Sequence, residues 1–266
     1  IRVVAYRGVI GNISFLNPES WITFLHPRVS KIVCVADAIK QHLTEDVRLL
    51  SMRVPPNKLQ RIYKGHDLAW YQDSPTDLSQ FGVPEGAFVV CCTGRDRPRK
   101  GFDVLVRAVD ELPEDVEVHL LLVGDVINNE ELKFQIAGTK HPERIHFTGY
   151  RQDAPGIAAA SDVFVLPSTE REGLPRAIIE AMAYGVAPVV TRVGGMPELV
   201  ENGVSGLVVP QKDASALSEA IAQLYRDRDL LDRMGKAAKE RIATRFHTSQ
   251  TVRETGELYQ SLMGRD

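Results

Sequence analysis

Two glutamates at the start of an apolar helix are the first residues here that could do chemistry. In REGLPRAIIEAMAYG (171–185), Glu172 comes just before the predicted helix and Glu180 lies inside it, since Pro175 suits a first helical position. The residues around Glu180 are Ala, Ile and Met, so we expect this helix to be buried and its carboxylate to need partners. Arg176, four residues earlier, could form a salt bridge, although Arg before Glu is the weaker order. A ligand diol could donate two hydrogen bonds instead. Both alternatives stay open at this point.

A cluster of cations provides a second candidate. GRDRPRKGFD (94–103) carries Arg95, Arg97, Arg99 and Lys100 directly before a predicted helix. A helix N-terminus favours an anion, and nearby cations add to that preference. The cluster is equally compatible with a diphosphate clamp and with a solvated basic loop.

Both clusters follow predicted strands of one sheet. From about residue 86, short apolar strands rich in β-branched residues alternate with amphipathic helices. Such a pattern predicts a doubly wound α/β domain, with a parallel sheet covered on both faces. Ligands of such domains bind beyond the carboxyl ends of the strands, where both clusters would meet. The predicted strands are 87–94, 116–124, 145–149, 162–168, 187–191 and 206–210, and the predicted helices are 102–112, 129–138, 175–185 and a segment from Asp213 onward.

Residues 1–80 are predicted to be part of a second, similar domain. A strand at 31–36, a helix with Asp37 as its N-cap and a strand at 59–65 are all expected there. About 80 residues are fewer than the roughly 100–150 that a doubly wound domain needs, and the chain starts at Ile1 without Met. We therefore expect a piece of a longer protein. The complete domain is assigned to 81–248, and 249–266 to a C-terminal helix that crosses back to the first domain.

Composition excludes several classes of protein. A net charge of −3 gives no electrostatic footprint for nucleic acid, and three cysteines are too few for a disulfide framework. No stretch has the length of a membrane span or the features of a signal peptide. A metal is not expected, because the histidines lack ligand spacing and the acidic pair Asp227 and Asp229 falls in a charged helical tail, where a solvated turn is the simpler interpretation. The sequence has no GxGxxG fingerprint, which argues against a dinucleotide oxidoreductase.

Six sequence blocks, taken in their order along the chain, resemble those of the retaining glycosyltransferases of family 4, which have the GT-B fold. The blocks are GRDRPRKGFD, HFTGY (146–150), SDVFVLPS, EGLPRAIIEAMAYG (172–185), APVVT and GGMPELVENGVSGLVVP (194–210). The resemblance implies a complete Rossmann-like C-terminal domain that binds the nucleotide-sugar donor. It also implies a partial Rossmann-like N-terminal domain on the acceptor side.

The resemblance also implies roles for individual residues. Glu172 and Glu180 match the family's E-x7-E pair, in which the first contacts the donor hexose near its reacting carbon and the second holds the ribose hydroxyls. Arg95 and Lys100 match the pair that neutralises the donor diphosphate, which stabilises the leaving group. The catalytic residues implied are therefore Glu172, Arg95 and Lys100.

Further donor contacts follow from the same resemblance. Backbone groups around Gly173 and Leu174 would contact sugar and phosphate. Pro175 replaces a glycine found in many members, which removes one N–H donor. The turn at Arg151 would pack on the nucleobase through main chain. The implied donor-binding set is Glu180, Gly173, Leu174, Pro175, Arg176, Gly94 and Arg151.

Other positions are expected to have structural roles or depart from the family. Gly194 and Gly195 are expected to allow close packing or a tight turn near the cleft, and His66 to be structural. In AYRGVIGN, Arg7 stands where many members carry a histidine near the acceptor. The family's usual histidine role therefore stays unassigned here.

The predicted activity is transfer of a sugar from a UDP- or GDP-sugar to an acceptor hydroxyl with retention of configuration, without a cofactor or metal. Alternatives are a donor-binding fragment without turnover and, as a weaker hypothesis, a sugar-nucleotide epimerase. The predicted partners are the nucleotide sugar and a glycan or lipid-linked acceptor, with no nucleic acid. The predicted location is the cytoplasm, including peripheral contact with the inner face of a membrane.

Overall fold

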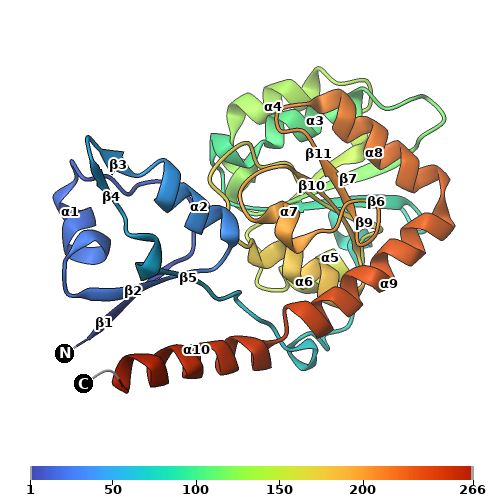
Figure 1. Ribbon diagram of the computed structural model, residues 1–266. Helices are drawn as coiled ribbons and strands as arrows, with labels where there is room; N and C mark the ends of the chain where they lie inside the picture. Colours follow the sequence, from blue (N-terminus) through green and yellow to red (C-terminus); the bar gives the residue numbers. More distant parts are fainter. Residues whose placement is uncertain (1, 265–266) are drawn as a thin grey trace.

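The computed structural model describes residues 2–264 and contains two α/β units (Figure 1). Ile1, Arg265 and Asp266 lie outside the described residues, and the last two belong to the predicted C-terminal segment, 249–266. The larger unit holds a six-stranded parallel sheet in the order β11-β10-β9-β6-β7-β8, which confirms the predicted α/β fold class. Its strands are β6 (Phe88–Thr93), β7 (Val118–Val123), β8 (Ile145–Gly149), β9 (Val163–Leu166), β10 (Ala187–Thr191) and β11 (Leu207–Val209).

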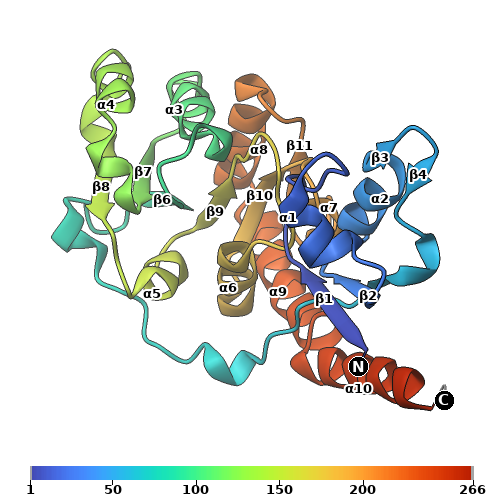
Figure 2. The same ribbon diagram turned by 90° about the vertical axis from the view of Figure 1, so that its left-hand side faces the viewer.

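Helices cover both faces of this sheet because its strands are apolar on both sides (Figure 2). Along β6, Val89 and Cys91 belong to the core on one face, whereas Phe88, Val90 and Cys92 belong to the core on the other. The helices of the larger unit are α3 (Phe102–Asp110), α4 (Glu130–Ala137), α5 (Ala154–Ala159), α6 (Arg176–Tyr184), α7 (Met196–Leu199), α8 (Ala214–Arg226) and α9 (Arg228–Arg245).

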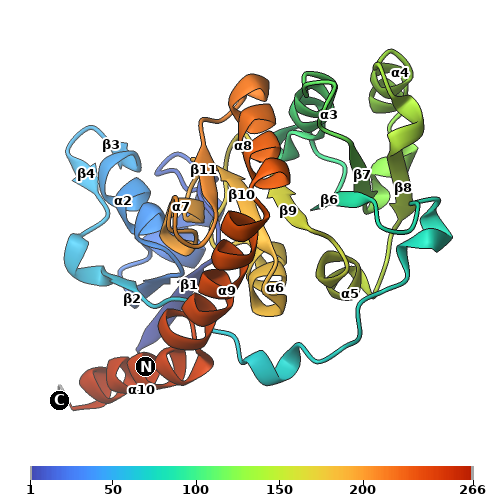
Figure 3. The same cartoon turned by 90° about the vertical axis from the view of Figure 1, so that its right-hand side faces the viewer.

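The smaller unit contains a three-stranded parallel sheet in the order β1-β2-β5. Helix α10 (Thr248–Met263) follows α9 and lies along this unit, where Leu258 and Leu262 pack with Val33 and Ile62 (Figure 3). The predicted domain limits at residues 80 and 248 stay a prediction. The remaining elements here are β1 (Val3–Arg7), β2 (Val29–Cys34), β5 (Leu59–Arg61), α1 (Pro18–Ser20), α2 (Asp37–Glu45) and the short hairpin of β3 (Arg48–Leu49) and β4 (Met52–Arg53).

The predicted N-cap role of Asp37 is wrong. Helix α2 starts at Asp37, and the capping position falls on Ala36, which has no side-chain acceptor. The carboxylate of Glu198, from α7 of the larger unit, takes the role. It accepts hydrogen bonds from the backbone N–H groups of Asp37 and Ala38, at 2.7 and 2.8 Å. The larger unit therefore caps a helix of the smaller one.

The strand predicted at 59–65 is shorter than expected, because the chain leaves the sheet after Arg61 and meets the segment before α10. The N–H of His66 donates to the carbonyl of Phe246 at 2.8 Å, and Thr248 N–H donates to the carbonyl of His66 at 3.2 Å. A Cβ on Gly65 would lie 2.6 Å from the carbonyl oxygen of His247, so this approach requires glycine. The two connections between the units are thus bound together where they cross.

His66 is buried at this crossing and hydrogen bonds through Nδ1 to the hydroxyl of Tyr71. Burial lowers the pKa of His66 to about 4, and the positive charges of Lys64 and Arg176 act in the same direction. The imidazole is therefore neutral near pH 7.

Replacing His66 by Asn is expected to flatten the pH dependence of stability. Because the pKa of His66 is about 4 in the folded chain and 6.5 ordinarily, the unfolded chain binds the proton first as pH falls. The contribution of the neutral His66 to the free energy of unfolding is complete above pH 6.5 and is lost progressively toward pH 4, by up to about 3 kcal/mol. Urea unfolding of both proteins from pH 4 to 7 measures the difference between their free energies, and parallel profiles would contradict the assignment.

A matched pair of helical glycines tests the packing of α9 on the end of α6. A Cβ on Gly235 would overlap the carbonyl oxygen of Gly185, whereas a Cβ on Gly256 of α10 would meet nothing within 4 Å. Gly235→Ala is therefore expected to lower the free energy of unfolding by about 1–3 kcal/mol. Gly256→Ala should raise it by about 0.5–1 kcal/mol through helix propensity. Equal effects of the two changes in urea unfolding would rule out the close contact.

Candidate functional site

An open cleft of about 880 Å³ lies at the carboxyl edge of the larger sheet, between the loops that follow β6 and β9. The structure thus brings together the two clusters on which the sequence predictions rest. Six of the predicted site residues line the cleft, namely Gly94, Arg95, Lys100, Glu172, Pro175 and Arg176.

Glu172 is buried at the floor of this cleft and carries the strongest contacts there. Its Oε1 lies 2.6 Å from Lys100 Nζ and 3.7 Å from a nitrogen of Arg99, and it accepts a 2.7 Å hydrogen bond from Ser168 Oγ. All of these contacts fall on one carboxylate oxygen. A buried carboxylate is stable only when it is paired and hydrogen-bonded, and here both conditions are met.

The loop after β6 places Lys100 by its backbone geometry. Pro98–Lys100 forms a single helical turn that ends at Gly101, whose φ of 71° is left-handed. A Cβ on Gly101 would overlap the carbonyl oxygen of Pro167, at the end of β9. Glycine therefore lets the two loops approach closely enough for Lys100 to reach Glu172.

Glycines also bring the loop after β9 against the smaller unit. A Cβ on Gly173 would overlap the carbonyl oxygen of Gly8, and a Cβ on Gly195 would lie 2.5 Å from the carbonyl oxygen of Gly173. Gly194 has a φ of 55°, and its Cβ would overlap the carbonyl of Glu172. The close packing expected of Gly194 and Gly195 is therefore present, directly behind the glutamate.

Glu180 lies in the second turn of α6, with 13% of its side chain exposed. Arg176 Nε lies 2.6 Å from its Oε1, so the salt bridge that the sequence left open is present. Burial raises the pKa of Glu180, and Arg176 opposes this shift. The side chain of Arg176 is 71% exposed and lines the cleft, whereas Glu180 lies outside the cleft lining, next to Arg176. Helix α6 begins at Arg176, one residue later than predicted, and Pro175 holds the capping position.

The other predicted donor residues lie around the cleft, outside its lining. Gly173 and Leu174 are buried behind Glu172. Arg151 forms a double hydrogen bond with Asp153, at 2.8 and 2.9 Å, and its guanidinium lies 5.3 Å from the ring centre of Phe81. The side chain of Arg151 is therefore held by its neighbours, and the contact of this turn with a nucleobase stays a prediction.

Ser168 is a functional contact that the sequence analysis missed. It is fully buried, follows β9 and donates to Glu172, while its carbonyl accepts from the hydroxyl of Thr191. A small polar residue immediately after an apolar strand, four positions before a glutamate, was the available signal.

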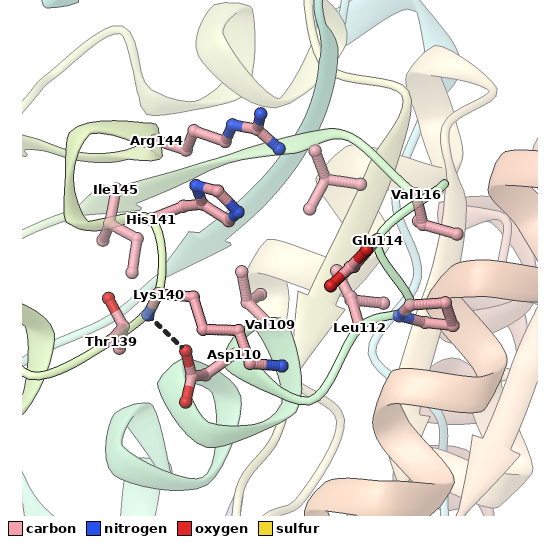
Figure 4. Close-up of a pocket in the computed structure, with 12 residues that line it drawn as sticks. Val109, Asp110, Leu112, Glu114, Val116, Thr139, Lys140, His141, Arg144 and Ile145 are labelled. Atoms are coloured by element: carbon pink, nitrogen blue, oxygen red, sulfur yellow. Dashed lines mark hydrogen bonds between the residues drawn. The ribbon is translucent and has the colours of Figure 1, made fainter.

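A second, smaller cavity lies at the opposite edge of the sheet, near the amino ends of β7 and β8. Figure 4 shows its lining, which includes Val109, Leu112 and Ile145, and the 2.6 Å hydrogen bond from Lys140 N–H to Asp110. Its volume of about 40 Å³ suits one or two waters. It is no candidate for a site that binds a large ligand.

The described residues, 2–264, contain no group of three or more His, Cys, Asp or Glu placed to hold a metal ion. Asp227, from the acidic pair noted in the sequence, accepts a 2.8 Å hydrogen bond from Leu230 N–H and caps α9. Metal independence stays a prediction.

The chain belongs to the family described as glycosyl transferases group 1, whose model matches residues 73–241. It is 27% identical to N-acetyl-alpha-D-glucosaminyl L-malate synthase of Bacillus anthracis, covering 87% of this chain and 61% of that protein. It is 28% identical to the Escherichia coli UDP-Gal:alpha-D-GlcNAc-diphosphoundecaprenol alpha-1,3-galactosyltransferase, covering 86% and 60%. The chain thus spans about three-fifths of the length of these relatives.

Solved structures show the same fold and confirm the GT-B prediction. A glycosyltransferase from Rickettsia africae superposes with a TM-score of 0.84 at 22% identity, over 99% of this chain and 71% of that one. Anabaena Alr3699/HepE in complex with UDP-glucose superposes with a TM-score of 0.77 at 28% identity, over 88% and 64%.

The Lys100–Glu172 pair is expected to stabilise the folded protein. Lys100→Met should lower the free energy of unfolding by about 1–3 kcal/mol, because it leaves a buried carboxylate without its nearest cation. Combining it with Glu172→Gln should restore part of this loss. Arg95→Met on the same loop is the control, expected within about 0.5 kcal/mol because Arg95 is exposed. If Lys100→Met and Arg95→Met lower the free energy of unfolding equally in urea unfolding, the Lys100–Glu172 pair contributes nothing to stability.

Proposed function

We propose that the protein transfers a sugar from a nucleotide-diphosphate-sugar to an acceptor hydroxyl with retention of anomeric configuration. The observation that carries this proposal is the buried Glu172, held by Lys100 and Ser168 on the floor of a cation-lined cleft. Membership of the glycosyl transferases group 1 family supports it, as does the similarity to a protein solved with UDP-glucose.

In this proposal the cations stabilise the departing diphosphate. Arg95 and Lys100 lie on the same side of the cleft, just before the N-terminus of α3. Negative charge grows on the leaving group as the glycosidic bond breaks, and preorganised cations stabilise that charge most. Lys100 would then serve both Glu172 and the diphosphate.

Glu172 is proposed to orient the hexose rather than to attack it. Its Oε1 already contacts Lys100, Arg99 and Ser168. These contacts stabilise the carboxylate and so reduce its nucleophilicity. The arrangement favours a front-face mechanism, in which the acceptor attacks from the side of the departing diphosphate and the configuration is retained.

Glu180 is proposed to accept hydrogen bonds from the ribose hydroxyls, with Arg176 as its partner when no nucleotide is bound. The base would pack on the main chain of the turn at Arg151. The donor is proposed to be a UDP- or GDP-sugar, used without a cofactor or metal.

The acceptor is proposed to be a glycan or lipid-linked sugar. One relative is named for a diphosphoundecaprenol-linked acceptor, and another is named as a colanic acid biosynthesis glycosyltransferase. Such acceptors place the reaction on the cytoplasmic side of a membrane, with peripheral contact to it. None of the described helices is long and apolar enough to cross a membrane.

The nucleotide site can be tested by binding. Glu180→Ala should weaken nucleoside diphosphate binding about 10–100-fold, because it removes the acceptor for two hydroxyls. Glu172→Ala should change nucleotide affinity less than threefold and impair turnover instead. Calorimetric titration with UDP, GDP and ADP, with and without EDTA, measures both variants and identifies the base.

The same titration distinguishes the alternatives. Wild-type affinity for the nucleotide in Glu180→Ala would refute the ribose assignment, and loss of binding in EDTA would refute metal independence. Normal binding by wild type without transfer from the matching nucleotide sugar, tested on a panel of lipid-linked acceptors, would favour a donor-binding fragment without turnover.

A further inference from the structure

One face of α6 connects the cleft to the linker between the units. Arg176, Glu180 and Tyr184 recur at intervals of four residues, so they lie along the same side of the helix. Arg176 lines the cleft at one end of this row. At the other end, the ring of Tyr184 meets the ring of Tyr71 edge-on, with ring centres 5.9 Å apart and an interplanar angle of 72°. Glu180 therefore lies between the cleft and a linker tyrosine.

Tyr71 is anchored by His66. The hydroxyl of Tyr71 hydrogen bonds to Nδ1 of His66, and the two rings stack with centres 5.9 Å apart. The backbone of His66 is itself bound on both sides to Phe246 and Thr248, where the two interunit connections cross. The position of Tyr71 against α6 is thus set by the part of the linker whose backbone is hydrogen-bonded to the segment before α10.

This polar arrangement carries an energetic cost. His66 Nε2 and the hydroxyl of Tyr184 are buried without a hydrogen-bond partner among the described residues. An apolar pair of similar volume would pack there without such unpartnered atoms. Burial raises the pKa of Tyr71 to about 12, with the charge of Glu180 acting in the same direction and that of Arg176 opposing it, so the hydroxyl stays protonated near pH 7.

We propose that His66 and Tyr71 are positioning residues for Glu180. Their hydrogen bond holds the Tyr71 ring against Tyr184 and closes the linker side of the Glu180 carboxylate. On the protein side the carboxylate then has the salt bridge to Arg176 and the nearby charge of Lys64, and the hydroxyls of a bound ribose would complete its hydrogen bonds. This inference rests on the proposed nucleotide site and extends it, because it makes the interunit linker a determinant of ribose recognition.

The test is discrimination between ribose and 2′-deoxyribose. The dissociation constants of UDP, GDP and ADP are compared with those of their 2′-deoxy analogues in wild type and Tyr71→Phe. Loss of the hydrogen bond to His66 should reduce the ribose preference about threefold to tenfold. Tyr63→Phe is the matched control, since Tyr63 is in the same connection but its ring packs on Phe246 and its hydroxyl bonds Arg245 and Glu198, none of them in α6, so it should leave the preference unchanged.

A double-mutant cycle separates positioning from general structural damage. In the Glu180→Gln background, Tyr71→Phe should have no further effect on ribose preference, because the charged group it positions is gone. An undiminished effect in that background, or an unchanged preference in Tyr71→Phe alone, would overturn the positioning role while leaving the nucleotide site intact. Failure of wild type to bind any of the three diphosphates, or to prefer ribose, would overturn both proposals.

Discussion

The buried ion pair between Lys100 and Glu172 is the interaction around which the cleft is organised. It joins two loops 72 residues apart in sequence, at the carboxyl ends of two strands that pair in the middle of the sheet. A buried carboxylate without a cation would be strongly unfavourable, so the pair sets how closely the loops must approach. Gly101 permits that approach on one side and Gly194 on the other, because any Cβ there would overlap a neighbouring carbonyl. The close approach of these two loops therefore determines both the chemistry of the cleft and the packing at the sheet edge.

The two units share an apolar core cluster, and directional contacts fix their alignment at this edge. Gly173 lies against the carbonyl of Gly8, and Glu198 caps α2 across the boundary. Such contacts are directional, and each requires its partner within a few tenths of an ångström. They place the loop after β1, which contains Gly8 and Gly11, directly opposite the loop of Glu172; Gly11 lies close to the side chain of Arg171. The smaller unit therefore forms the wall opposite Glu172.

Local patterns were sufficient to predict the larger sheet and the two clusters beside its carboxyl edge. Strands buried on both faces are apolar along their whole length, and their helices begin with recognisable caps, such as Asn129 and Asp213. What could not be predicted depends on residues that meet only in three dimensions. The Glu198 cap on α2 acts across 161 residues and displaces the local candidate, Asp37. Ser168 and Glu172 are only four residues apart in the sequence, but the contact matters because both side chains are buried, which the sequence alone does not show. The Arg176–Glu180 pair on α6 could be proposed from its spacing, but the contact of Tyr184 with Tyr71 of the linker could not.

Helix α6 explains why a glutamate is tolerated in an apolar segment. Its buried residues, Ile178, Ile179 and Met182 among them, pack in the core, whereas Arg176 at its start lines the cleft and Tyr184 at its end meets the linker. Arg176 compensates the carboxylate from the solvent side, where its guanidinium loses little hydration. In the proposed nucleotide complex a ligand diol would share that compensation, and the exposed arginine would stay solvated if it moved away. The proposed ribose contact would thus exchange one partner of a half-buried charge for another, which suits reversible binding.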